Sequence, residues 1–314
     1  MKKYYAIVAA LILFGCGGGG GGGGGGGEPP PPPPPPPPPT GLTAYEDSLR
    51  GLSLASFYEV SIEGLTRRSP ESIVWQGLQD VYPVEFADLD DLSEDYRLET
   101  YEYYRVALEA LRTYDRASLS AAEQVNYDVY EWYLQDRVDE LEFVNYGFPA
   151  TYSNFGVPRN TQTFFTEIHP LETAADVQDY INRLSVIDRK FGQLEDWLNL
   201  QRDEGIVEPG ITMDVAIAQV SEIANMAAAE LPYYTHFRDS LPNVSDLTNA
   251  ERANFREVAL SSMFRDVLPA YSSLLATLQS LRAEAPTAIG VGQYPRGPDY
   301  YTYMLRHRTS TDLT

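Results

Sequence analysis

Apolar side chains at helical spacing run through most of this 314-residue chain. Between Thr173 and Gly205 the apolar residues follow one another at intervals of 4, 3, 3, 4, 3 and 4: Val177, Ile181, Leu184, Ile187, Phe191, Leu194 and Leu198. Because an α-helix has about 3.6 residues per turn, these residues fall on one stripe. The spacing predicts a single helix, which begins at the capping hydroxyl of Thr173 and ends at Gly205, a left-handed terminator.

Other segments repeat this pattern, and the alternation typical of strands is nearly absent. One helix is predicted around Tyr127, Tyr130, Leu134, Val138 and Leu141, and its opposite face carries Asp128, Glu131, Asp136, Asp139 and Glu140. Further helices are predicted at Thr43–Arg67, Tyr96–Thr113, Thr212–Glu230 and Ala250–Val267, with Pro269 breaking or kinking the last before it resumes to about Ala283. The predicted fold is mainly α, an array of long antiparallel helices.

Two predicted loops interrupt this array, Tyr146–Phe165 and Ala285–Tyr301, and both are rich in Gly, Pro and aromatic residues. Long loops in helical proteins often carry function. The alternative for the first loop is an ordered connector that its own aromatic side chains hold together.

The first sixteen residues have the features of a lipoprotein signal peptide. Lys2 and Lys3 precede the apolar run Tyr4–Phe14, which is shorter than the roughly twenty residues that span a bilayer. The run ends in "LFGC", which resembles a bacterial lipobox, so we expect cleavage before Cys16 and lipidation of its thiol. The alternative is an ordinary thiol.

Residues 17–41 form a predicted disordered tether, and residues 42–314 a helical domain. The glycines of Gly17–Gly27 behave as a flexible coil, and Pro29–Pro39 favours a polyproline rod of about 34 Å. The expected partner is a lipid bilayer and the location the cell envelope. The outer membrane is favoured over the inner because Gly17, not Asp, follows Cys16. A net charge of −22 argues against nucleic acid.

The residues give few signs of catalytic chemistry. His169, His236 and His307 are not at zinc-ligand spacing, and Cys16 is the only cysteine. We expect no catalytic residue, no metal ligand and no cofactor in this chain. Acidic pairs such as Asp136 and Glu140 fit a glycosidase, but their abundance favours a solvated acidic face.

Candidate substrate contacts follow a Gly-Pro turn near the end of the sequence: Tyr300, Tyr301, Arg306 and His307. Arg306 and His307 can bind an anionic group such as a peptide carboxylate. The alternative is that they complement a helix C-terminus and form salt bridges in this acidic protein.

Two predicted helices start with a capping box, "LSAAE" at Leu119–Glu123 and "LTNAE" at Leu247–Glu251. The final "DLT" begins the same phrase, with Thr314 as the cap. We therefore expect that a further helix was about to begin and that the chain is truncated.

The order of "SFYEVSIEGLTRRSPESIVWQGL", "AEQVNYDVYEWYL", "PLETAADVQDYINRL", "GIVEP" and "GPDYYTYMLRHRTSTDLT" resembles the N-terminal half of the bacterial family called domain of unknown function 885. Members of that family are often lipoproteins. The last stretch, from Gly297, is the most specific. One departure is Gly210, since the family commonly has Arg after the "GIVEP" proline.

The resemblance implies a mainly helical, zinc-metallopeptidase-like fold, in which a downstream His-Glu-x-x-Pro-Gly-His stretch holds zinc and supplies a general base. That stretch does not occur in this sequence. We expect a non-catalytic N-terminal portion of a membrane-anchored protein, which contributes scaffold and contacts to a peptide substrate, with zinc only in full-length relatives. The alternative is a complete, non-enzymatic surface lipoprotein that binds peptide or glycan, and a metal-independent hydrolase with paired carboxylates is a more distant one.

Overall fold

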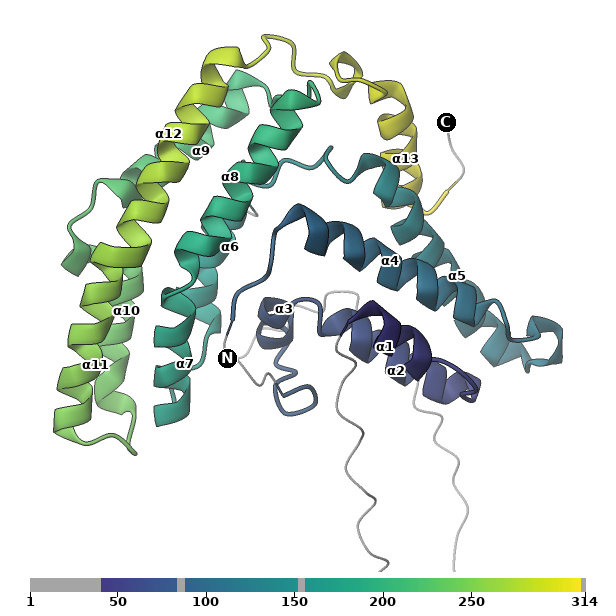
Figure 1. The fold of residues 1–314 in the computed structure, drawn as a ribbon, viewed down its shortest axis with the longest axis horizontal. Helices are drawn as coiled ribbons and strands as arrows, with labels where there is room; N and C mark the ends of the chain where they lie inside the picture. Colours follow the sequence, from purple (N-terminus) through teal and green to yellow (C-terminus); the bar gives the residue numbers. More distant parts are fainter. Residues whose placement is uncertain (1–40, 84–87, 152–155, 312–314) are drawn as a thin grey trace, which may run out of the picture. The chain divides into compact units, whose positions relative to one another are not determined.

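The computed structural model describes residues 41–83, 88–151 and 156–311, and throughout these ranges the regular secondary structure is helical (Figure 1). The mainly α prediction is confirmed for them. The α-helices are α1 (Leu42–Ser48), α2 (Leu54–Thr66), α3 (Pro70–Trp75), α4 (Glu94–Leu111), α5 (Ala121–Glu140), α6 (Val157–Thr163), α7 (Ala174–Leu184), α8 (Ile187–Asp203), α9 (Gly210–Ala224), α10 (Pro232–Ser240), α11 (Asn249–Ser262), α12 (Leu268–Glu284) and α13 (Gly297–Thr309). The signal peptide with Cys16, the tether up to residue 40 and the cap at Thr314 lie outside the described residues.

The single helix predicted from Thr173 to Gly205 is wrong, because the structure divides it into α7 and α8. The backbone leaves the helical conformation at Val186, where φ is −121° and ψ is 10°. Two successive intervals of three residues, from Ile181 through Leu184 to Ile187, would rotate the apolar stripe by about 120° around a continuous helix. The break lets Leu184 and Ile187 both be fully buried.

Other helices also begin or end at different residues from those predicted. Thr43–Arg67 is divided into α1 and α2 by a turn in which Gly51 has a φ of 71°. The helix predicted at Thr212–Glu230 ends at Ala224. The two predicted loops are partly helical, since the first contains α6 and the second contains the start of α13.

Pro269 lies at the point where the structure departs from regular α-helix. The five residues Met263–Val267 form a π-helical segment that joins α11 to α12, and α12 continues to Glu284. Proline has no amide hydrogen for the carbonyl four residues earlier, here that of Arg265, and its ring collides with that carbonyl. The wider π turn occurs at this position.

Both predicted capping boxes are formed. The side chain of Ser120 accepts from the amide of Glu123, and that of Thr248 accepts from the amide of Glu251. In each case the glutamate side chain accepts from the backbone amide of the capping residue. Thr173 and Asp176 form a third capping box at the start of α7.

Buried side chains form three clusters. The largest joins helices α7 to α12, among which α9 and α12 lie side by side along their lengths (Figure 1). The second joins α1, α2, α4 and α5 around Tyr45, Phe57 and Leu134. The third is small and largely aromatic, with Phe143, Tyr146, Ile206, Tyr294 and Tyr303. This third cluster holds α13 beside the end of α5.

Candidate functional site

The start of α13 is fixed by Arg296, which has a left-handed backbone with φ 53°. Its guanidinium donates to Glu142 across 2.8 Å and lies 5.0 Å from the centre of the Phe143 ring. One turn later Tyr300 packs on the rings of Phe143 and Tyr146, with centroid distances of 5.5 and 4.8 Å. These contacts fix which residues of α13 reach α5.

The last turn of α13 meets acidic residues at the end of α5. His307 Nδ1 lies 2.7 Å from Asp136 Oδ2, and Arg306 Nη2 donates to Asp139 Oδ2 across 2.5 Å. Asp136 is 4% exposed, so its charge depends on this contact for compensation. Arg137 Nη1 forms a further ion pair with Glu140 at 2.8 Å. We call Asp136, Arg137, Asp139, Glu140, Tyr303, Arg306 and His307 the α5–α13 cluster.

The α5–α13 cluster places an imidazole in a defined orientation. Nδ1 of His307 lies 2.7 Å from Asp136 Oδ2, which can only accept, and 3.2 Å from Arg137 Nη2, which can only donate. We assign the proton to Nδ1 because the contact with Asp136 is the shorter, and this leaves Nε2 for another group. The ring of His307 also stacks on Tyr303, at a centroid distance of 5.7 Å. Burial raises the pKa of Glu140, and the charge of Arg137 opposes that shift.

Two polar atoms of the α5–α13 cluster have no hydrogen-bond partner within the described part of the chain. They are Oδ1 of Asp136 and Nε of Arg137, and both are buried. The prediction that Asp136 lies on a solvated acidic face is wrong, because α13 covers that end of α5 and Asp136 is buried.

The four predicted substrate contacts are not equivalent in the structure. Tyr300 is half-buried in the aromatic cluster, and Tyr301 is 55% exposed. Arg306 pairs with Asp139 and His307 with Asp136, both on α5, as the salt-bridge alternative expects. A role in binding substrate stays a prediction for all four.

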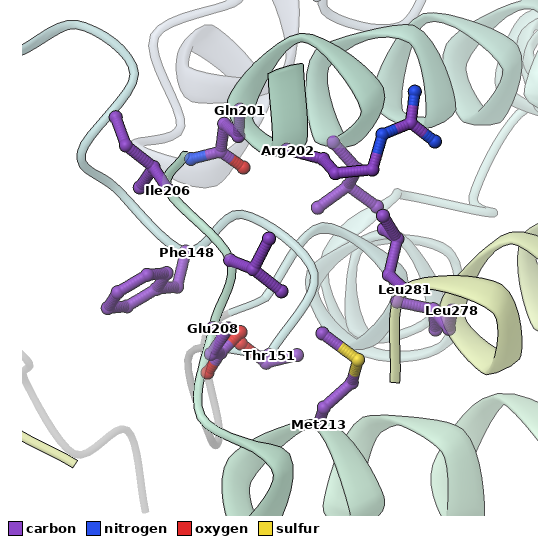
Figure 2. Close-up of a pocket in the computed structure, with 11 residues that line it drawn as sticks. Phe148, Thr151, Gln201, Arg202, Ile206, Glu208, Met213, Leu278 and Leu281 are labelled. Atoms are coloured by element: carbon purple, nitrogen blue, oxygen red, sulfur yellow. The ribbon is translucent and has the colours of Figure 1, made fainter. Parts of the chain in front are cut away.

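A small pocket near "GIVEP" contains a residue that the sequence analysis had not singled out, Glu208 (Figure 2). Glu208 is 8% exposed, and burial raises the pKa of its carboxyl group to about 7, against the effect of a hydrogen bond with Thr212. Thr151 also points into the pocket, and its buried hydroxyl has no partner among the described residues. The free space is about 10 Å³, enough for about one water molecule. The pocket therefore has room for a water molecule beside Glu208 and not for a substrate.

Gly210, which stands where the family commonly has arginine, lies beside the guanidinium group of another residue, Arg282. A Cβ atom at Gly210 would lie 2.6 Å from the guanidinium carbon of Arg282. Arg282 comes from α12, and its Nε donates to Asp214 Oδ1 across 2.7 Å. A guanidinium group thus lies beside the position where the resemblance leads one to expect an arginine.

Within the described ranges, no three His, Cys, Asp or Glu side chains gather closely enough to hold a metal ion. The helices of residues 41–311 that the structure describes include none that is both long and apolar enough to cross a bilayer.

The described part of the chain is an all-α domain in which α13 packs on aromatic and acidic residues at the end of α5. Comparison with known proteins identifies its family. Residues 70–314 match the family described as bacterial protein of unknown function (DUF885), and the chain belongs to this family. No curated protein matches the chain.

A solved structure has the same fold. It is that of the "putative lipoprotein" from Colwellia psychrerythraea, which is 18% identical in sequence and superposes with a TM-score of 0.76. The match covers 86% of this chain and 47% of that chain. The chain therefore spans about half the length of the solved relative.

Proposed function

We propose that this chain is the N-terminal, non-catalytic portion of a membrane-anchored, metallopeptidase-like lipoprotein, to which it contributes scaffold and contacts to a peptide substrate. The observation that carries the proposal is the unequal coverage in the structural match, 86% of this chain against 47% of the solved one. About half of that relative has no counterpart here, and the catalytic zinc site belongs to that half in the proposal.

The α5–α13 cluster, together with Tyr301 of the same helix α13, supports a role in substrate contact. The exposed ring of Tyr301 offers apolar area together with a hydroxyl group. A peptide carboxylate would compete with Asp139 for Arg306, whose side chain is 37% exposed. His307 keeps Nε2 for a hydrogen bond while Asp136 holds Nδ1. Arg306 and His307 thus combine a salt-bridge role with a surface that an anionic group can approach.

Among the described residues, none of the three histidines belongs to a group of ligands that could hold a catalytic zinc. His169 is buried, with Nδ1 at 2.7 Å from the carbonyl oxygen of Pro170 and Nε2 in contact with Arg183. Nδ1 of His307 faces Asp136 and Nε2 stays open, but within the described ranges His307 belongs to no group of three ligands that could hold a metal ion. No step of peptide hydrolysis is therefore assigned to this chain.

The proposal is tested with the full purified chain. Zinc content is measured by mass spectrometry, and hydrolysis of fluorogenic peptides is followed with and without a chelator. We expect no stoichiometric zinc and no chelator-sensitive hydrolysis. Bound zinc with chelator-sensitive activity would contradict the non-catalytic assignment. The DNA beyond codon 314 is also read, and a coding segment for His-Glu-x-x-Pro-Gly-His there would support it.

Anchoring is tested separately in a bacterial host. Cells that express the chain are labelled with radioactive palmitate and fractionated. We expect label on the chain and recovery with the envelope, and loss of both in Cys16→Ser. Envelope recovery of the unlabelled Cys16→Ser variant would show that another feature holds the chain there.

A further inference from the structure

A larger pocket lies between α6, α9 and α12, and it shares no lining residue with the α5–α13 cluster or with the pocket at Glu208. Its free volume is about 120 Å³. An engineered apolar cavity of roughly 150 Å³ binds benzene, so this space suits a group the size of an aliphatic side chain. Size alone makes it the better ligand site of these two pockets.

The floor of this pocket is apolar and has its hydrogen bonds satisfied. Val220 and Ile223 of α9 are 1% and 5% exposed. The hydroxyl group of Tyr271 lies 2.7 Å from that of Tyr233 and also donates to the carbonyl oxygen of Pro158. The floor therefore favours an apolar group and offers no unsatisfied polar atom of its own.

Two opposite charges line the same pocket from different helices. Arg159 belongs to α6 and Glu222 to α9, and both are exposed. Over the described residues neither forms an ion pair or a hydrogen bond, with the other or with a third group. Arg282 and Arg306, in contrast, are each paired with an aspartate. Burial raises the pKa of Tyr271 while the charge of Arg159 opposes the shift, so the guanidinium acts on the pocket floor.

We propose that this pocket binds a free α-amino acid with an aliphatic side chain. Its carboxylate would pair with Arg159, its ammonium with Glu222, and its side chain would lie on Val220 and Ile223. A zwitterion could form a charge-assisted hydrogen bond of about 2.8 Å at each end, one to each of two side chains that line the pocket and form no ion pair with each other. Gln162 and Gln219, which line the same pocket, add amide groups that can donate or accept.

Arg159 and Glu222 together favour a ligand that carries both a carboxylate and an ammonium group. A peptide C-terminus has the carboxylate but no ammonium beside it, and an amine has only the positive group. Either one leaves Arg159 or Glu222 without a partner. The proposed site is independent of zinc and of the metallopeptidase-like assignment, so it stands or falls on its own measurements.

The test is calorimetric titration of the full chain at pH 7 with L-leucine, L-leucinamide and N-acetyl-L-leucine. We expect saturable binding of L-leucine, and at least about tenfold weaker binding of the two derivatives, since each loses one charge-assisted contact. Arg159→Gln and Glu222→Gln should each weaken L-leucine binding by about the same factor. Matched controls are Arg308→Gln and Glu257→Gln, which change exposed residues outside the pocket.

Three results would overturn the proposal. The first is no saturable heat with L-leucine up to millimolar concentration by a chain whose circular dichroism shows it folded. The second is binding of N-acetyl-L-leucine as tight as that of L-leucine, with no effect of Glu222→Gln, which would make the site one for peptide C-termini. The third is equal weakening by the control variants.

Discussion

His307 on α13 and Asp136 on α5 are 171 residues apart in sequence, yet their Nδ1 and Oδ2 atoms lie 2.7 Å apart. The contact joins α13, whose buried side chains belong to the small aromatic cluster, to α5, whose buried side chains Tyr127 and Leu134 belong to another cluster. It also supplies the nearest cationic or imidazole donor to a carboxylate that is 4% exposed.

Replacing His307 should therefore destabilise the protein. His307→Leu leaves Asp136 charged and buried with only the longer contact to Arg137, and we expect a loss of about 2 kcal/mol in the free energy of unfolding. Asp136→Asn in the same chain should restore part of it. Urea denaturation measures both. Arg308→Gln, an exposed neighbour, serves as the control and should change stability by less than about 0.5 kcal/mol. An equal loss in the control would argue against the pair.

The ion pair between Lys190 of α8 and Glu71 of α3 is buried, with side chains 3% and 8% exposed. Lys190→Met should cost about 4 kcal/mol in the free energy of unfolding, because it leaves an uncompensated buried carboxylate. Adding Glu71→Gln removes that charge and keeps an acceptor for the amide of Asp90, which now donates to Glu71 across 3.0 Å. The double variant should recover most of the loss in urea denaturation. A double variant as unstable as Lys190→Met would contradict the electrostatic explanation.

A surface pair provides the comparison for Lys190. The side chains of Arg282 and Asp214 are 41% and 58% exposed. Arg282→Gln should cost no more than about 1 kcal/mol, since solvent screens exposed charges.

Glu208 should make stability fall as the pH rises. Its carboxyl pKa is raised from 4.5 to about 7 by burial, so the native protein holds the proton over a range in which the unfolded chain releases it. The stabilisation is complete below pH 4.5 and is lost as the pH rises through 7, by about 3 kcal/mol. Urea denaturation at pH 5 and pH 8 should show this loss reduced in Glu208→Gln. In Glu257→Gln, at an exposed position, the wild-type dependence should persist.

His169 should act in the opposite direction. Burial, together with the charge of Arg183, lowers the pKa of His169 from 6.5 to about 4. Its contribution is complete above pH 6.5 and is lost as the pH falls through 4. His169→Gln should therefore flatten the acid side of the stability profile, and an unchanged acid side would show that the native histidine takes up a proton freely.

An apolar stripe on α5 should bind a hydrophobic dye. Val125, Val129 and Trp132 are 60%, 46% and 40% exposed, and they follow one another at helical spacing on the face opposite Leu134. Asp136 lies one turn further on that face, where α13 covers it. Val129→Lys with Trp132→Lys should reduce dye fluorescence by about half without loss of stability. Unchanged fluorescence would place the dye elsewhere, and Glu257→Lys controls for added charge.

Local signals in the sequence predicted local structure well. The capping boxes at Ser120 and Thr248 are formed because every atom they require lies within one helical turn. The prediction at Thr173–Gly205 failed at Val186, where the backbone leaves the helical conformation between two apolar residues, Leu184 and Ile187, that both become buried. The family was also predicted from the sequence, and its model matches residues 70–314.

Features that depend on distant partners could not be predicted in this way. Lys190 is charged, and it is buried only because Glu71, 119 residues away, meets it. The position of Asp136 in the sequence pattern predicts a solvated face, and only the packing of α13 on α5 makes it buried. The pocket of Arg159 and Glu222 arises where α6 meets α9, and neither segment contains a motif for it.

The π-helical segment Met263–Val267 determines which face of α12 points into the core. A π turn holds one residue more than the hydrogen bonding of an α-helix requires. Deleting one residue there would restore regular bonding but turn α12 by about 100° about its own axis. Leu274, Leu278 and Leu281, now buried along α12, would leave the core. The packing of α12 therefore depends on the length of this segment more than on its composition.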